Sequence, residues 1–120
     1  MTNYVWLATF SAMLAIGQLL FKQAALTMQG SSVLEGLIKL AQTPVFYLAL
    51  ALYGGATLLW VWILSRVPLS QAYPWVALAM AAVPVLAAIV FHERVGLVYW
   101  VGIALVILGV SLTQYGSQAS

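Results

Sequence analysis

The sequence predicts an all-α, polytopic membrane protein with four transmembrane helices. Of its 120 residues, 65% are hydrophobic and only 5% are charged, whereas soluble domains carry about a quarter charged residues. Each of four uncharged runs is long enough to cross a bilayer, which takes ~20 residues; these runs are residues 1–21, 40–65, 67–91 and 95–120. Lipid offers the backbone no hydrogen-bond partners, and the sequence lacks the alternation typical of a transmembrane barrel, so we expect helices.

The first two expected elements are a spanning helix at about residues 4–27 and a short helix at about residues 32–42. Apolar residues recur at helical spacing in the short segment. Ser32 and Glu35 form a capping box, and Glu35 precedes Lys39 by one turn. This amphipathic pattern is typical of a helix that lies in the membrane interface.

The other three spanning helices are expected at about residues 44–65, 69–91 and 96–114. Pro44 suits the first turn of the second span, and Arg66 would anchor the end of that span among the headgroups. Four spans use nearly the whole chain. We therefore expect residues 1–120 to form a single transmembrane domain.

Composition and motifs argue against several function classes. A formal net charge of +2 is too small to indicate nucleic-acid binding. The sequence has no cysteine, and its one histidine, His92, cannot form a metal site alone. We also find no nucleophile–base pair, phosphate loop or nucleotide-binding fingerprint. We therefore expect no enzyme activity, no cofactor and no metal.

A polar stripe follows the first expected helix. Ser11, Gln18 and Lys22 are spaced by seven and four residues, so they share one helix face, and Gln23 follows directly. Such a stripe usually faces a bundle interior or a hydrated cavity, where it would suit an anionic headgroup. Alternatively, Lys22 extends to the interface and Gln18 bonds a neighbouring helix. The sequence leaves both interpretations open.

Further polar residues flank the third expected span. Tyr73 either lies at the interface, as aromatic residues commonly do, or lines a substrate cavity. Consecutive residues do not share a helix face, so the "HER" tripeptide is not an acid–base cluster. We expect Glu93 either to anchor at the headgroups or to reach Lys22 or Arg66. The candidate gating or headgroup residues are Arg66, His92, Glu93 and Arg94.

The acidic residues are informative because of where they lie. Both Glu35 and Glu93 fall between the expected spans. A proton-driven exporter of cations typically needs a carboxylate inside the membrane. The sequence therefore argues against a proton/cation antiporter.

The fourth expected helix carries two glycines on one stripe. Gly102 and Gly109 are seven residues apart, and small residues let helix backbones approach closely in lipid. The partner surface could belong to the same chain or to a second subunit.

These features resemble the small four-helix transporters of the drug/metabolite transporter superfamily, of the small multidrug resistance type. Residues 4–22 align with the first helix of that family without gaps and end on its lysine, Lys22. The segment "GIALVILG" resembles the dimerisation motif of its fourth helix, at Gly102 and Gly109. The drug exporters carry an essential glutamate midway along the first helix, where this chain has Leu14. Their coupling chemistry is therefore not implied here.

The sequence is more similar to an EamA-like branch, the undecaprenyl-phosphate–aminoarabinose flippase subunits. The shared residues are Gly17, Gln18, Lys22, Gln23, Ala24, Val67, Pro68, Ala72, Tyr73, Pro74, His92 and Glu93. This resemblance implies a multi-pass protein of the bacterial inner membrane, paired as a homodimer or with a related four-helix subunit. It would move a polyprenyl-phosphate-linked sugar or a related anionic lipid between leaflets.

In this interpretation, Lys22 contacts the phosphate, Gln18 and Gln23 offer hydrogen bonds, and Ser11 and Tyr73 line the path. Two alternatives stay open on the sequence. One is a small multidrug or metabolite exporter, and the other is a non-transporting partner subunit of another membrane protein.

Overall fold

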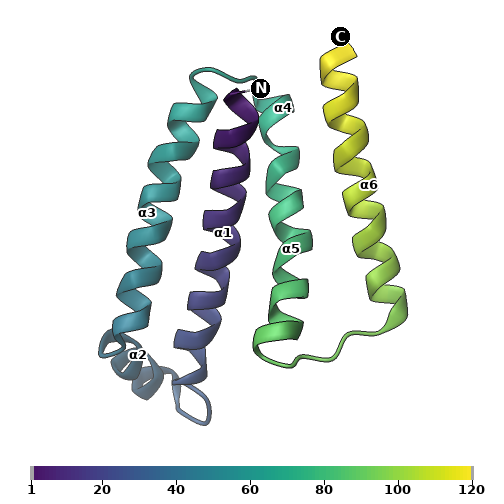
Figure 1. Cartoon of the computed structure of the whole chain (residues 1–120). Helices are drawn as coiled ribbons and strands as arrows, with labels where there is room; N and C mark the ends of the chain where they lie inside the picture. Colours follow the sequence, from purple (N-terminus) through teal and green to yellow (C-terminus); the bar gives the residue numbers. More distant parts are fainter. Residues whose placement is uncertain (1, 120) are drawn as a thin grey trace.

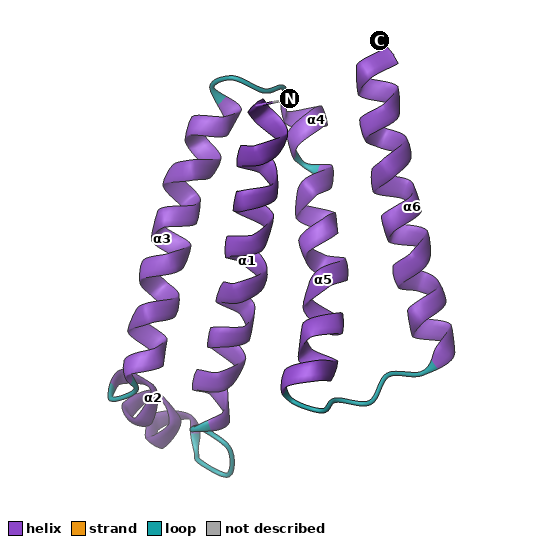
Figure 2. Cartoon of the chain, viewed as in Figure 1, coloured by secondary structure: helices purple, strands orange, loops and turns teal. Residues whose placement is uncertain are grey.

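The computed structural model describes residues 2–119, with side-chain surroundings described for residues 3–116. The helices are α1 (Thr2–Leu26), α2 (Val33–Ala41), α3 (Pro44–Leu64), α4 (Leu69–Ala72), α5 (Pro74–Val90) and α6 (Leu97–Ala119) (Figure 1). Figure 2 shows that only loops and turns join them within the described chain. Four segments are long and apolar enough to cross a membrane, namely Asn3–Leu26, Pro44–Leu64, Leu69–Val90 and Leu97–Gly116. The predicted all-α fold, with a short helix between the first two spans, is confirmed.

The spanning helices lie side by side in an order that differs from their order in the chain. α1 packs between α3 and α5, and α6 packs against the far side of α5 (Figure 1). One end of the bundle carries α2 and the connection between α5 and α6. The other end carries α4 and both ends of the chain (Figure 1). Residues that are distant in the sequence therefore meet at the same end.

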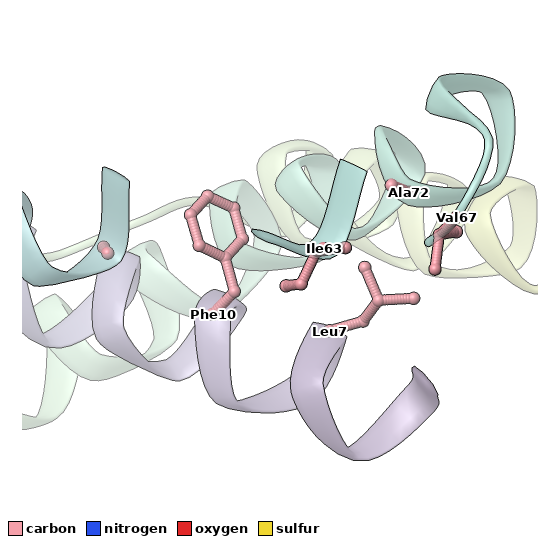
Figure 3. Packing of buried hydrophobic residues seen from close by; sticks show 6 residues of the cluster. Leu7, Phe10, Ile63, Val67 and Ala72 are labelled. Carbon is pink, nitrogen blue, oxygen red and sulfur yellow. The ribbon is translucent and has the colours of Figure 1, made fainter. Parts of the chain in front are cut away.

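The largest buried side chains lie where α1 meets α3, near the end of the bundle that carries α4. Leu7 and Ile63 are fully buried, and Phe10 lies beside them (Figure 3). Most other buried apolar residues are alanines, as expected where helices in lipid associate through close backbone approach. Large apolar side chains mostly point outward, where hydrocarbon surrounds them.

Two helix boundaries differ from the expected ones. Tyr73 separates α4 from α5, so the segment expected as one helix is interrupted within the span Leu69–Val90. Pro74 explains this break, because proline has no N–H to donate and favours the first turn of a new helix. α6 continues to Ala119, beyond the expected end near residue 114. No proline follows Gln114, and one glycine does not stop a helix.

The short helix α2 is capped as predicted by Ser32, whose hydroxyl accepts a hydrogen bond from the Glu35 N–H at 3.3 Å. Lys39 differs from the prediction: its Nζ donates to the Ser31 hydroxyl at 2.7 Å instead of pairing with Glu35. Gly36 is buried against Met28. The apolar residues on the outer face are exposed, and they are Val33, Leu34, Leu37 and Ile38.

Candidate functional site

A groove opens between α1, α3 and α5. Its volume is about 310 Å³. The lining residues are Leu14, Gln18, Tyr53, Val76, Ala79, Met80, Val83 and Pro84. Gln18 and Tyr53 supply the polar side chains of this otherwise apolar lining. The groove therefore combines an apolar wall with one amide–hydroxyl pair.

Neighbouring residues of α1 hold the Gln18–Tyr53 pair in position. The Gln18 Nε2 group donates a hydrogen bond to the Tyr53 hydroxyl oxygen. A Cβ atom at Gly17 would lie only 2.5 Å from Cε2 of Tyr53, so the ring needs glycine at this position. The Phe21 ring contacts the same ring at 4.9 Å between centroids. Gly17 and Phe21 thus aim the Tyr53 hydroxyl at Gln18.

The sequence analysis did not single out Tyr53. A lone hydroxyl within an apolar run gives little signal, and its partner lies 35 residues away. The available clue was its depth: Tyr53 lies well inside a span, whereas tyrosines usually gather at membrane interfaces. A phenol at that depth needs a hydrogen-bond partner from another helix.

Lys22 lies one turn beyond Gln18 on α1, about 6 Å further along the axis. Its Nζ is 3.9 Å from Oε2 of Glu93, in the connection between α5 and α6. The two side chains are 47% and 46% exposed. Glu93 therefore reaches Lys22 rather than Arg66, which follows α3 at the other end of the bundle (Figure 1). This ion pair stands at the end of the groove nearest α2.

Ser11 and Gln23 have different surroundings from Gln18. Ser11 is buried, and its hydroxyl donates to the backbone carbonyl of Trp75 at 2.9 Å, which ties α1 to α5. Gln23 is exposed and does not line the groove. Of the polar residues on the predicted stripe, Gln18 is the one that lines the groove, and Lys22 stands beyond it.

Tyr73 and Arg66 lie at the opposite end of the bundle from Lys22. The Tyr73 side chain is 61% exposed, and its ring lies 6.4 Å from the Trp60 ring. The Arg66 guanidinium carbon lies 4.6 Å from the centre of the Trp62 ring, a cation–π contact. The structure does not bring Tyr73 into the groove lined by Gln18.

The remaining candidates lie around α6 and the connection that precedes it. His92 has a left-handed backbone, with φ of 56°, and Arg94 is exposed. Gly102 lines an apolar groove of about 380 Å³ between α5 and α6. A Cβ atom at Gly102 or at Gly109 would meet nothing within 4 Å.

These features define a class: a four-helix membrane protein whose central groove pairs an amide with a phenol and has a lysine at one end. The sequence profile of the EamA-like transporter family matches residues 2–115. The chain belongs to the EamA-like transporter family.

Similar curated proteins cover nearly the full length of the chain. The three described next are each named "Probable 4-amino-4-deoxy-L-arabinose-phosphoundecaprenol flippase subunit ArnE". The Proteus mirabilis protein is 33% identical over 89% of this chain and 92% of its own length. An Enterobacter relative is 36% identical over 92% of this chain and 94% of its own length. A Hamiltonella defensa relative is 31% identical over 97% of this chain and 99% of its own length. No solved structure matches the chain.

The family and its relatives settle the cellular context. Four apolar spans and bacterial relatives of this kind make the chain a multi-pass protein of the inner membrane. The resemblance to EamA-like transporters and to the flippase-subunit branch is confirmed. The names of the family and of the relatives describe transport rather than catalysis.

Proposed function

We propose that this chain is a flippase subunit that moves a polyprenyl-phosphate-linked sugar, or a related anionic lipid, across the inner membrane. The observation that carries this proposal is the Gln18–Tyr53 pair inside the groove, followed one turn later by Lys22. The names of the similar proteins supply the substrate class.

The chemistry of such a substrate matches these positions in order. A sugar loses its hydrogen bonds to water when it crosses the bilayer, and the Gln18–Tyr53 pair can replace some of them. The ammonium group of Lys22 has three donors and a positive charge, which suits a phosphate at the headgroup level. The prenyl chain can stay in the surrounding hydrocarbon. No carboxylate occurs in the sequence of the four spans to repel the phosphate.

The other candidate residues have supporting roles in this proposal. Gln23, exposed beside Lys22, offers an amide at the same end. Ser11 positions α5 against α1 through its bond to Trp75. At the opposite end, Tyr73 and Arg66 would meet the headgroup as the substrate enters or leaves.

We also propose that the working unit is a dimer with a second four-helix subunit, either identical or related. None of the described α6 residues 97–116 is buried, and the stripe of Gly102 and Gly109 is open. The relatives are named as subunits. A partner on α6 would cover a surface that one chain leaves exposed. We further propose that the protein is not an enzyme and needs no cofactor.

The test compares lipids that co-purify with the wild type and with Lys22→Ala, identified by mass spectrometry after mild extraction. We expect polyprenyl phosphate species to be enriched on the wild type and lost from Lys22→Ala. Lys39→Ala is the matched control, because Lys39 lies at the same end but donates to Ser31. Bulk phospholipid alone in all three samples would contradict the proposal. If the wild type and Lys22→Ala bind aromatic cations equally well, the protein is an exporter instead.

A further inference from the structure

The ion pair between Lys22 and Glu93 joins α1 to the α5–α6 connection, one turn of α1 beyond Gln18 of the groove. We propose that Glu93 acts as an exchangeable counter-anion: it holds Lys22 until a lipid phosphate takes its place. This inference rests on the proposed function and adds to it a residue that sets how tightly Lys22 binds a lipid phosphate.

The distance between the two groups allows exchange. At 3.9 Å, Nζ and Oε2 attract each other electrostatically, but they lie beyond the roughly 2.7–3.2 Å of an N–H···O hydrogen bond. The ammonium donors of Lys22 are therefore not committed to this carboxylate. A phosphate oxygen that approaches to hydrogen-bond distance gains a stronger, charge-assisted bond.

Because both groups are exposed, breaking the ion pair costs little free energy. Both side chains are nearly half exposed, so water and salt screen their attraction, and exposed pairs of this kind stabilise proteins little. A phosphate can displace the Glu93 carboxylate without leaving a buried charge unpaired. The displaced carboxylate returns to water.

The backbone before Glu93 places the carboxylate beside α1. α5 ends at Val90, and the Phe91 N–H still bonds the Ala87 carbonyl at 2.9 Å. His92 then adopts a left-handed conformation, with φ of 56°, as residues that follow a helix end often do. This turn brings the next residue, Glu93, to Lys22. The pair is therefore set by the fold of the connection and not only by long side chains.

A counter-anion at this position raises the binding free energy that a lipid must supply to occupy Lys22. Without Glu93, Lys22 would attract any anionic phospholipid in the bilayer. With Glu93 present, a lipid must offset the lost ion pair, and a headgroup that also reaches the Gln18–Tyr53 pair does so best. Glu93 thus lowers phosphate affinity in general and leaves discrimination to the groove.

The experiment titrates farnesyl monophosphate, and farnesol as its uncharged counterpart, into the detergent-purified full-length chain by calorimetry. We expect Glu93→Gln to tighten binding of farnesyl monophosphate by about two- to five-fold at low ionic strength. Farnesol binding should not change. Glu93→Ala should act in the same direction, and Glu35→Gln, the matched change on α2, should have no effect. In a Lys22→Ala background, Glu93→Gln should also have no effect.

Two results would overturn the inference. If Lys22→Ala weakens phosphate binding but both Glu93 variants leave it unchanged or weaken it, Glu93 is a structural partner only. In that case the exchanged pair Lys22→Glu with Glu93→Lys should keep the stability of the wild type but should not bind farnesyl monophosphate. If the wild type binds farnesyl monophosphate no better than farnesol, the phosphate site itself fails, and the proposed function falls together with the counter-anion.

Discussion

α1 and α6 are both long, apolar helices without acidic residues, yet their surroundings are opposite. α1 packs between α3 and α5 and contributes Leu7, Phe10 and Ala15 to the buried set, whereas α6 packs mainly against α5 (Figure 1). None of the described α6 residues 97–116 is buried. Hydrophobicity does not distinguish the two helices, because lipid is as apolar as their side chains.

The difference lies in how each helix uses its small and polar residues. In α1, Gly17 receives the Tyr53 ring, and Ser11 bonds the backbone at Trp75. In α6, Gly102 and Gly109 lie in open space. Both helices carry a stripe of small residues that permits close approach. Side chains and backbone of the same chain contact this stripe on α1, whereas the space beside the two glycines on α6 is open. This contrast is why we place the second subunit on α6.

The sharpest test of this contrast makes one substitution in both helices. Gly17→Val would push a side chain into the Tyr53 ring, which is fixed by its neighbours, so we expect a loss of about 1–3 kcal/mol of stability and of lipid binding. Gly109→Val meets open space and should leave the monomer as stable as the wild type. Unfolding in mixed micelles, followed by circular dichroism, measures both. Equal losses in the two variants would remove the contrast.

Gly109→Val should have its effect on assembly instead. If α6 carries the subunit interface, the added methyl groups should weaken the dimer while the monomer stays folded. Cross-linking in native membranes measures the dimer fraction. Ala104→Val, at an exposed position two residues from Gly102 and therefore on another face of α6, is the matched control. An unchanged dimer fraction would move the interface away from the Gly102 and Gly109 stripe.

A second pair of substitutions compares leucines. Leu7→Ala removes a fully buried side chain, and Leu105→Ala removes one that is 62% exposed. In water a buried leucine-to-alanine change costs ~2–5 kcal/mol. Part of that cost is transfer from water, which lipid removes, so we expect about 1–2 kcal/mol for Leu7→Ala and almost nothing for Leu105→Ala. The same unfolding measurement applies, and a larger loss in Leu105→Ala would show that α6 is packed after all.

A smaller effect is expected at Ser11. Replacing Ser11 with alanine removes the hydrogen bond to the Trp75 carbonyl without adding volume. Hydrogen bonds between membrane helices contribute about 0.6 kcal/mol on average, so the stability loss should be of that size. Thr113→Ala on α6 is the control, because its hydroxyl bonds only within its own helix, to Val110. If Ser11→Ala instead abolishes lipid binding at unchanged stability, Ser11 contacts the substrate directly.

The sequence predicted what depends on local chemistry. Uncharged runs of sufficient length predicted the spans, and Ser32 predicted the start of α2. The sequence left Glu93 open between a headgroup anchor and a partner of Lys22 or Arg66, and the structure pairs it with Lys22. The spacing of Ser11, Gln18 and Lys22 predicted a common face. The spacing could not show that Ser11 packs against another helix whereas Gln18 lines the groove.

What the sequence missed depends on which helices become neighbours. Tyr53 faces Gln18 only because α3 packs on α1, and periodicity within either helix does not encode that contact. Tyr73 sits at a break that Pro74 indicates, but its distance from the groove depends on the direction of the whole span. The spacing of residues within one helix shows which of them share a face. Which neighbouring helix that face contacts depends on how the helices pack.

The smallest effect is expected for His92→Gly, in the connection between the packed helices and the exposed α6. Its left-handed backbone disfavours residues with a Cβ atom, and glycine adopts it freely but loses more chain entropy on folding. His92→Gly should therefore change stability by only a few tenths of a kcal/mol. His92→Val, a β-branched residue at positive φ, should lower stability by about 1–2 kcal/mol. The same micelle unfolding curves measure both variants. If His92→Val is as stable as His92→Gly, this turn does not constrain the connection, and the placement of Glu93 beside Lys22 must come from the side chains alone.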